Sequence, residues 1–150
     1  MAALHRAWAP DLDAATLYAL LRLRAEVFVG EQASPYVDPD GRDLLPLTRH
    51  LWIEDDGRIV ATARLLEDEG PEGSVFRVGR LCVARQARGR GDGARLLEAA
   101  LAEVGDRPCH LAAQTYLREM YAKFGFEPAG DEYVEDGIPH IPMIRTRGYE

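Results

Sequence analysis

Arginine and glycine residues alternate in one short stretch of the chain, and this stretch is the one best suited to bind a ligand. Residues 80–94 read Arg-Leu-Cys-Val-Ala-Arg-Gln-Ala-Arg-Gly-Arg-Gly-Asp-Gly-Ala, which predicts a strand, a glycine-rich turn and the start of a helix. Glycine allows positive φ angles and a close approach of the backbone to a ligand, and free N–H groups at a helix start carry partial positive charge. The pattern therefore predicts a pyrophosphate site, which Arg88 or Arg90 would reinforce. A turn that binds nothing is the weaker alternative, because three glycines alternate with arginines here.

Two other phosphate-binding motifs fit this turn less well. A P-loop needs Gly-Lys-Ser/Thr after its first glycine, and no such triplet follows here. Gly89, Gly91 and Ala94 satisfy the spacing of a dinucleotide fingerprint. That fingerprint also needs an acidic residue at the end of the next strand to hold a ribose, whereas residues 112–115 read Ala-Ala-Gln-Thr. The dinucleotide interpretation is therefore set aside.

The segment Arg88-x-x-Gly91-x-Gly93 resembles the acyl-CoA pyrophosphate motif of the GNAT superfamily of N-acetyltransferases. Residues 78–83 resemble the strand whose backbone follows the pantetheine in that superfamily. Residues 120–126, Met-Tyr-Ala-Lys-Phe-Gly-Phe, resemble its tyrosine-bearing motif. Segments similar to the ElaA-like subgroup lie at residues 21–32, 35–43, 49–50 and 135–141. The resemblance covers nearly the whole chain and implies an α/β (α+β) fold, with a mixed, mostly antiparallel central sheet flanked by helices.

The resemblance implies an N-acetyltransferase that moves the acetyl group of acetyl-CoA, used as a co-substrate, to an amine by direct attack on the thioester. Tyr121 matches the family tyrosine and is expected to protonate the departing thiolate; its alternative role is that of a core tyrosine. The residues expected to contact CoA are Leu81, Cys82, Val83, Arg88, Gly89, Arg90, Gly91, Asp92, Gly93 and Gln114. Asp92 replaces an aliphatic residue usual in the superfamily. Its carboxylate would repel a pyrophosphate unless it turned outward to cap the helix.

The attacking amine must be neutral, and two residues are expected as candidates for its general base. Glu31 follows a helix break at Gly30, so its carboxylate is expected to face the cleft. His50 lies in a predicted strand, and His140 is a second histidine of suitable chemistry. An acidic loop is expected to attract a cationic amine, and it contains Asp38, Asp40 and Asp43. No spacing of Cys and His resembles a zinc site, so no metal is expected.

Two alternative functions stay open. One is a non-catalytic CoA-binding regulatory module that has lost turnover, and Tyr121 argues for an active enzyme instead. The other is an acyltransferase like the acyl-homoserine-lactone synthases, whose Arg-x-x-Val-Phe segment resembles residues 24–28. The complete turn at residues 88–93 argues against it, because such synthases take their acyl group from a carrier protein.

The composition is that of one folded domain, which we place at residues 1–150. Of the 150 residues, 47% are apolar and 29% are charged, and the net charge of −7 argues against a nucleic-acid partner. No apolar run reaches the ~20 residues that span a bilayer. The first residues meet charge and proline too early for a signal peptide. We expect a cytoplasmic protein with a small-molecule or peptide amine as acceptor, no nucleic-acid or membrane partner, and a possible homodimer formed through its late strands.

The predicted elements place the glycine-rich turn between a strand and a helix. A first helix, capped by Asp11 or Asp13, is expected to run to Gly30, and a second follows the glycine-rich turn. Thr115 is expected to cap a third helix that ends at Phe124. Strands are expected at residues 4–8, 49–54, 59–66, 75–83, 110–113, 133–134 and 138–144, with an acidic loop at 67–73. Early antiparallel strands followed by strand–helix–strand–helix predict a mixed sheet.

Overall fold

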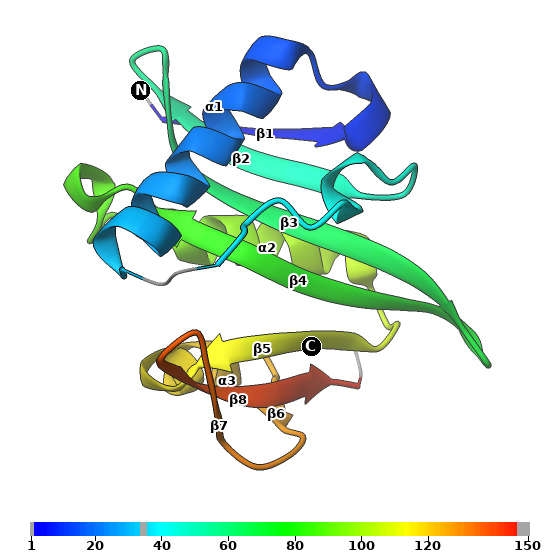
Figure 1. Ribbon diagram of the computed structural model, residues 1–150. Helices are drawn as coiled ribbons and strands as arrows, with labels where there is room; N and C mark the ends of the chain where they lie inside the picture. The colour runs from blue at the N-terminus through cyan, green and yellow to red at the C-terminus, as the bar shows by residue number, and fades with distance from the viewer. Residues whose placement is uncertain (1, 34–35, 147–150) are drawn as a thin grey trace.

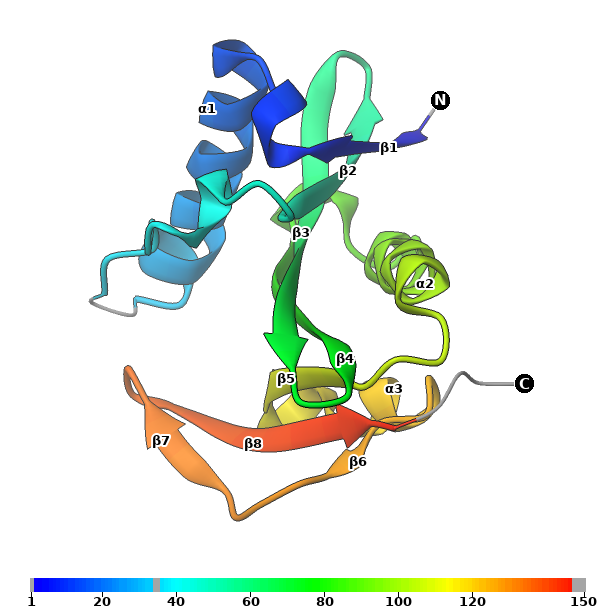
Figure 2. The ribbon, with the colours of Figure 1, turned by 90° about the vertical axis from the view of Figure 1, so that its right-hand side faces the viewer.

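An eight-stranded sheet forms the centre of the protein, and helices lie against both of its faces (Figures 1 and 2). The computed structural model describes residues 2–33 and 36–146. The strands follow the order β1-β2-β3-β4-β5-β8-β6, and β7 pairs with β8. Their bounds are β1 Ala3–Trp8, β2 Arg49–Asp55, β3 Arg58–Gly70, β4 Gly73–Val83, β5 Cys109–Gln114, β6 Glu127–Pro128, β7 Tyr133–Glu135 and β8 Ile138–Arg145. Among the described strands only β4 and β5 pair in parallel, which confirms the expected mixed, mostly antiparallel sheet.

The α-helices are α1 Ala14–Arg24, α2 Asp92–Val104 and α3 Arg118–Ala122. Helices α1 and α2 lie on opposite sides of the sheet, as Figure 2 shows. Helix α2 buries an apolar stripe at helical spacing, made of Leu96, Leu97, Ala100, Leu101 and Val104. Within residues 2–33 and 36–146, no helix combines the length and the apolar character needed to cross a membrane.

A carboxylate cap fixes the start of α1. Asp13 accepts a hydrogen bond from the Thr16 N–H at 2.7 Å, so Asp13, rather than Asp11, is the capping residue. This bond satisfies one of the N–H groups that a helix start leaves without an intrahelical partner.

The end of α1 widens into a π-helical segment, Ala25–Glu31. The Gln32 N–H closes it by bonding the Val27 carbonyl at 3.1 Å. Segments of this kind occur often at functional sites, because they change the direction of side chains within a helix. Here the segment and the residue after it contribute four residues to the lining of the cavity described below, Val27, Phe28, Glu31 and Gln32.

The hairpin of β3 and β4 is longer than the sequence predicts. Residues 67–73 are predicted as an acidic loop, but β3 runs to the first glycine of this stretch and β4 starts at the second. Side chains hold the extension together, since the Glu67 carboxylate accepts hydrogen bonds from Arg49 at 2.6 Å and from Ser74 at 2.7 Å. These long-range partners outweigh the local preference of acidic residues for loops.

The start of α3 also differs from the prediction. A 3-10 turn, Thr115–Leu117, precedes the helix, and the Arg118 N–H bonds the Thr115 carbonyl. The Thr115 hydroxyl is buried and has no hydrogen-bond partner in the described part of the chain, so it does not cap the helix. The helix ends at Ala122, not at the predicted Phe124.

Strands β4 and β5 separate in the middle of the sheet. They share two paired positions near the start of β5, and the described structure has no pairing between them beyond these. Strand β4 also bulges, because Arg80 and Leu81 together lie opposite the single residue Ala63 of β3. Arg80 has a φ of 52°, a value that non-glycine residues rarely adopt. The second half of β4 therefore has main-chain groups that no neighbouring strand occupies on its β5 side.

Candidate active site

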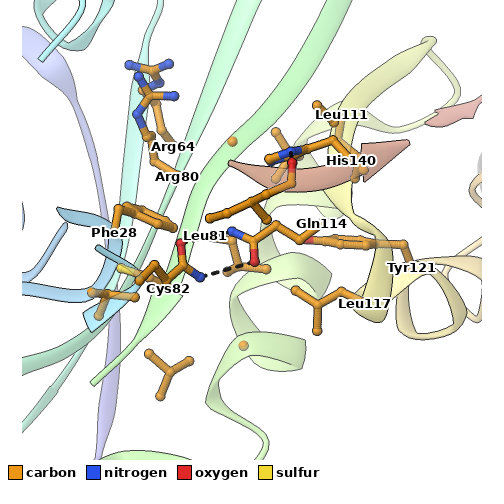
Figure 3. Close-up of a pocket in the computed structure, with 18 of the residues that line it drawn as sticks. Phe28, Arg64, Arg80, Leu81, Cys82, Leu111, Gln114, Leu117, Tyr121 and His140 are labelled. Carbon is orange, nitrogen blue, oxygen red and sulfur yellow. Dashed lines mark hydrogen bonds between the residues drawn. The ribbon is translucent and has the colours of Figure 1, made fainter. Parts of the chain in front are cut away.

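A cavity of about 640 Å³ opens where β4 and β5 separate (Figure 3). Its walls come from the end of the first helix, the second half of β4, β5, α3 and the β7–β8 turn. The site residues expected from the sequence that line it are Glu31, Leu81, Cys82, Val83, Arg88, Gly93, Gln114 and Tyr121. Those in the adjoining turn at the start of α2 are Gly89, Arg90, Gly91 and Asp92.

The glycine-rich turn presents backbone N–H groups beside this cavity. Gly89 and Gly91 have φ angles of 85° and 83°, which favour glycine. The Arg95 N–H bonds the Gly91 carbonyl at 3.0 Å and begins the helical ladder, so the N–H groups of residues 92–94 precede it. A Cβ atom added at Gly89 or at Gly91 would meet no atom within 4 Å, so the space beside both is open. The turn can therefore hold an anionic ligand such as a pyrophosphate.

Arg88 and Glu31 form an ion pair in the cavity wall. Both terminal nitrogens of the Arg88 guanidinium bond the Glu31 carboxylate, one of them at 2.7 Å, and Arg88 Nε donates to the Val83 carbonyl at 3.1 Å. The hydrogen bond from Arg88 lowers the pKa of Glu31 below its ordinary value. Glu31 is therefore ionised and weakly basic while this pair persists.

The Asp92 carboxylate does not turn outward to cap α2, contrary to one of the expected arrangements. Gly91 is the N-cap residue and has no side chain to make a capping bond, and Asp92 is buried. The Asp92 carboxylate accepts a hydrogen bond from Arg90 at 2.8 Å, and Arg90 also bonds Asp55 at 2.7 Å. The negative charge that would repel a pyrophosphate is thus paired with a guanidinium from the same turn.

Two glutamine amides join the opposite walls of the cavity. Gln32 donates to Gln114 at 3.1 Å, and Gln114 donates back to Gln32 at 3.2 Å. Figure 3 shows this contact near the middle of the cavity, with Gln114 reaching from the end of β5. The pair connects the end of the first helix to β5 at the point where the sheet is open.

Tyr121 reaches the cavity from α3 with its ring buried. Its ring packs edge-on against Phe126, with centroids 6.1 Å apart, and only 6% of the residue is exposed. In Figure 3 the phenol oxygen points from α3 into the cavity, toward Gln114. Burial raises the pKa of Tyr121 to about 12, so the hydroxyl carries its proton at neutral pH.

His50 does not reach the cavity, which is a correction to its expected role as a base. Its side chain is buried under the loop that precedes β2, and its Nε2–H donates to the Asp43 carbonyl at 2.9 Å. Burial lowers the pKa of His50 below its ordinary value. The structure brings His140 to the cavity instead. Its Nδ1–H donates to the Ile138 carbonyl at 2.7 Å, and its ring stacks on Tyr133.

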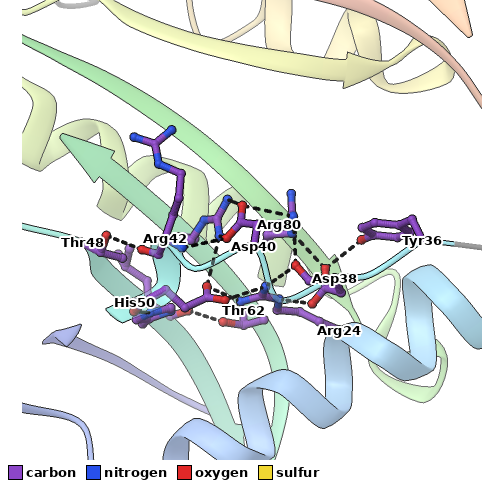
Figure 4. A network of polar contacts seen from close by, with 12 residues as sticks. Arg24, Tyr36, Asp38, Asp40, Arg42, Thr48, His50, Thr62 and Arg80 are labelled. Carbon is purple, nitrogen blue, oxygen red and sulfur yellow. Dashed lines mark hydrogen bonds and ion pairs between the residues drawn. The ribbon is translucent and has the colours of Figure 1, made fainter. Parts of the chain in front are cut away.

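The acidic loop before β2 is engaged by arginines and is not open to a cationic amine as expected (Figure 4). Arg24 is almost fully buried and bonds both Asp38 and Asp43 at 2.7 Å. Arg64 bonds the two oxygens of Asp40 at 2.8 and 2.9 Å. A third arginine, Arg80, also contacts Asp38. All three carboxylates are therefore in contact with arginines. Buried charges are stable only when they are paired in this way.

A family model described as an acetyltransferase (GNAT) domain matches residues 24–147. The chain belongs to the GNAT acetyltransferase family. The matched region begins at Arg24 and includes the glycine-rich turn, Tyr121 and β8. Every wall of the cavity thus lies within the GNAT match.

Similar proteins cover almost the whole chain. A UPF0039 protein of Mycobacterium tuberculosis is 60% identical over 144 residues, which cover 95% of this chain and 92% of that protein. Protein ElaA of Escherichia coli is 43% identical over 90% of each chain, and its crystal structure matches with a TM-score of 0.86. The crystal structure of an acyl-CoA N-acyltransferase from Pseudomonas aeruginosa has a TM-score of 0.90 and 41% identity, covering 97% of this chain and 99% of that one. These similarities confirm the GNAT fold and the ElaA-like relationship.

Several cavity residues of this GNAT chain escape prediction from the sequence. Arg64 lies in the apolar run of β3, where an unexpected charge is the available signal. Arg80 has no signal for its positive φ, because the bulge depends on the register of β3 with β4. Gln32 contacts a residue 82 positions away, and sequence spacing gives no information about such a contact.

Proposed function

We propose that this GNAT protein transfers an acetyl group from acetyl-CoA to an amine. The observation that carries the proposal is that the cavity at the separation of β4 and β5 adjoins the glycine-rich turn that begins α2. A ligand with a pyrophosphate at one end and a long, narrow thioester arm fits two such neighbouring features. Acetyl-CoA is this kind of ligand, and it acts here as the acyl donor.

The pyrophosphate end would bind the main chain of residues 88–94. The N–H groups of this turn can donate hydrogen bonds to phosphate oxygens. The open space beside Gly89 and Gly91 lets the phosphate reach these N–H groups. The Arg88 guanidinium would release the Glu31 carboxylate and bind the phosphate instead, which would add positive charge to the site. Arg90 keeps the nearby Asp92 neutralised.

The thioester arm would lie along the open side of β4. The Val83 carbonyl faces this side, since it bonds the Arg88 side chain. The main chain of Leu81, in the bulge, would stabilise the negative charge that develops on the thioester oxygen. Burial raises the pKa of the Cys82 thiol to about 12, so Cys82 is a poor nucleophile. This favours direct attack by the amine over an acetyl-cysteine intermediate.

Two side chains would move the protons. The Nδ1–H of His140 is donated to a carbonyl, which leaves Nε2 of the neutral ring as a proton acceptor for the attacking amine. As the new C–N bond forms and the C–S bond breaks, His140 takes a proton from the amine nitrogen. Tyr121 gives a proton to the departing sulfur. We assign Glu31 to the control of Arg88 instead of to base catalysis.

The proposal includes the cellular setting and the partners. Both cysteines are free thiols, which fits a reducing compartment such as the cytoplasm. The acceptor would be a small-molecule or peptide amine, since a chain with a net charge of −7 is poorly suited to bind nucleic acid. Homodimer formation stays a prediction, and sedimentation equilibrium would test it.

The test combines binding and turnover. Isothermal titration calorimetry with CoA and with acetyl-CoA should give saturable binding at one site per chain, and thiol release should require an added amine. Absence of CoA binding would overturn the proposal. Binding with no turnover across a broad amine panel would favour a regulatory module. Transfer only from an acyl carrier protein would favour chemistry like that of the acyl-homoserine-lactone synthases.

A further inference from the structure

The cavity extends beyond the proposed thioester position into a second arm. Figure 3 shows Gln114 near the middle of the cavity, with Leu117 on the side of α2 and Arg64 and Arg80 on the other side. The CoA site proposed above uses the side of α2. The arm next to Arg64 and Arg80, with His140 at its edge, is therefore left for the acceptor.

Carboxylates fix the two arginines of this arm in place. Arg64 is 4% exposed and bonds both oxygens of Asp40. Arg80 Nε lies 2.9 Å from the Asp38 carboxylate, and its Nη2 donates to the Asp38 carbonyl at 3.0 Å. Groups held this way lose little further freedom when a ligand binds to them.

Arg80 has hydrogen-bond donors that its contacts with the described residues leave unused. Its contacts with the described residues use Nε and Nη2, so the two hydrogens of Nη1 remain for a ligand. Its φ of 52° would suit glycine without strain, yet this position carries a long cationic side chain. Arg80 also precedes Leu81, whose main chain is proposed to contact the thioester. Its main chain thus adjoins the proposed reaction centre, and its side chain lines the same cavity.

Charge in this arm changes from its depth to its rim. The cationic residues of the arm are Arg64 and Arg80, which pair with the exposed Asp40 and the buried Asp38. Two acidic residues that line the cavity, Glu135 and Asp136, are exposed at the end of β7 and in the turn that follows it. An acceptor with both charges could place its anionic group in the depth and its amine toward the rim.

We infer that the acceptor is an amine that carries its own anionic group, a carboxylate or a phosphate, and that Arg80 binds this group. The inference rests on the proposed acetyl transfer and names the substrate class of the same site. A polyamine or a simple alkylamine would instead place positive charge beside Arg64 and Arg80.

Matched pairs of amines test this class. The panel contains the standard L-amino acids, each beside its own amide, and 2-aminoethyl phosphate beside ethanolamine, with spermidine as a cationic competitor. Thiol release from acetyl-CoA gives kcat/KM for each. In at least one pair, kcat/KM for the anionic amine should be at least tenfold higher than for the partner that lacks the anionic group. If the bound anion is a carboxylate, an amino acid should give the highest kcat/KM. If it is a phosphate, 2-aminoethyl phosphate should give the highest value. Equal or better use of amides or spermidine, or no use of any anionic amine, would overturn the inference.

Variants of Arg80 complete the test. Arg80→Gly suits the positive φ. It should lower kcat/KM for the anionic amine at least tenfold and leave the Kd of CoA unchanged. Arg80→Lys should keep part of the preference. Arg58→Gln, which changes the exposed first residue of β3, serves as the control and should change neither value. Retained preference in Arg80→Gly would contradict the assignment. If CoA itself does not bind the wild-type chain, the proposed function fails, whereas CoA binding with a preference for neutral amines refutes this inference alone.

Discussion

The Glu31 carboxylate holds the Arg88 guanidinium with two hydrogen bonds, although the residues lie 57 positions apart in the sequence. Arg88 is also the side chain that the proposed pyrophosphate would use. The carboxylate of the first helix and the phosphate of the co-substrate therefore compete for one cation. The competition links CoA binding to the position of the π-helical segment Ala25–Glu31.

Replacing Glu31 by Gln should tighten CoA binding. The pair is partly exposed, and exposed ion pairs are weak, so we expect an increase in affinity of about two- to fivefold. Titration calorimetry at low and at high salt measures it. Glu26→Gln, which removes the exposed partner of Arg22 in the same segment, is the matched control. Weaker binding by Glu31→Gln would mean that Glu31 positions Arg88 for the ligand instead of competing with it.

Replacing Gly91 by Ala should weaken both CoA binding and the fold. Gly91 and Gly105 lie at the two ends of α2, both have positive φ, and a Cβ at either position meets no atom within 4 Å. Gly91→Ala should therefore lose about 1–2 kcal/mol of stability from backbone strain, and Gly105→Ala, whose ψ of −128° lies outside the left-handed helical region, should lose at least as much. Only Gly91→Ala should lose CoA affinity, by at least tenfold, because Gly105 is far along the helix from the turn. Urea unfolding and calorimetry measure the two effects, and equal CoA affinity in both variants would refute the pyrophosphate site.

Features encoded by short spacings could be predicted from the sequence. The turn at residues 88–93, the apolar stripe of α2 and the Asp13 cap all depend on neighbours within a few positions. The arrangement of the sheet could be predicted only through the resemblance to the GNAT superfamily. The side of the sheet that His50 faces could not be read in the same way, because β2 is buried almost throughout its length and shows no clear alternation.

Charged residues misled prediction where distant partners engage them. The loop around Asp43 reads as an exposed acidic loop, but arginines from α1 and β3 neutralise it in the interior. Residues 67–73 read as a loop for the same reason and form the turn end of the β3–β4 hairpin. His140 and Arg80 join the cavity through the registers of β8 and β4, which depend on pairing between strands far apart in the chain.

Replacing Tyr121 by Phe should slow turnover without changing CoA binding. With a pKa of about 12, the hydroxyl stays protonated through neutral and moderately alkaline pH and can supply the proton that sulfur needs. Loss of a general acid typically costs about 10²–10⁴-fold in rate. Steady-state kinetics and calorimetry separate kcat from CoA affinity. Tyr18→Phe, on the exposed face of α1, is the control. Full turnover in Tyr121→Phe would leave this residue a structural role only.

Replacing His140 by Gln should reduce kcat. Gln can keep a polar contact with the Ile138 carbonyl but cannot accept a proton from the amine. The expected loss lies within the range of about 10²–10⁴-fold for a general base, with the Kd of CoA unchanged. His110→Gln, on β5 and outside the cavity lining, is the control. An unchanged kcat in His140→Gln would assign the base to another group.

Replacing Asp43 by Asn should destabilise the fold and flatten its acid sensitivity. Burial alone would raise the pKa of Asp43, but hydrogen bonds and charge from Arg24 and Arg64 hold it below the ordinary 3.8. A carboxyl with a lowered folded pKa stabilises the protein above about pH 4, and this contribution is lost as the pH falls through the folded value. Breaking such a buried pair should cost about 3–5 kcal/mol at neutral pH.

Urea unfolding at pH 7, 5 and 3 measures both effects of Asp43→Asn. The wild-type chain should lose stability between pH 5 and pH 3 more steeply than the variant, because the variant has one fewer carboxylate to protonate. The control is Asp68→Asn, which removes an exposed partner of Arg42 and should cost less than about 1 kcal/mol. Similar losses in the two variants would mean that the buried arginine–aspartate cluster contributes no more to stability than a surface ion pair. In that case Arg24 and Arg64 would have to be held in place chiefly by the packing around them.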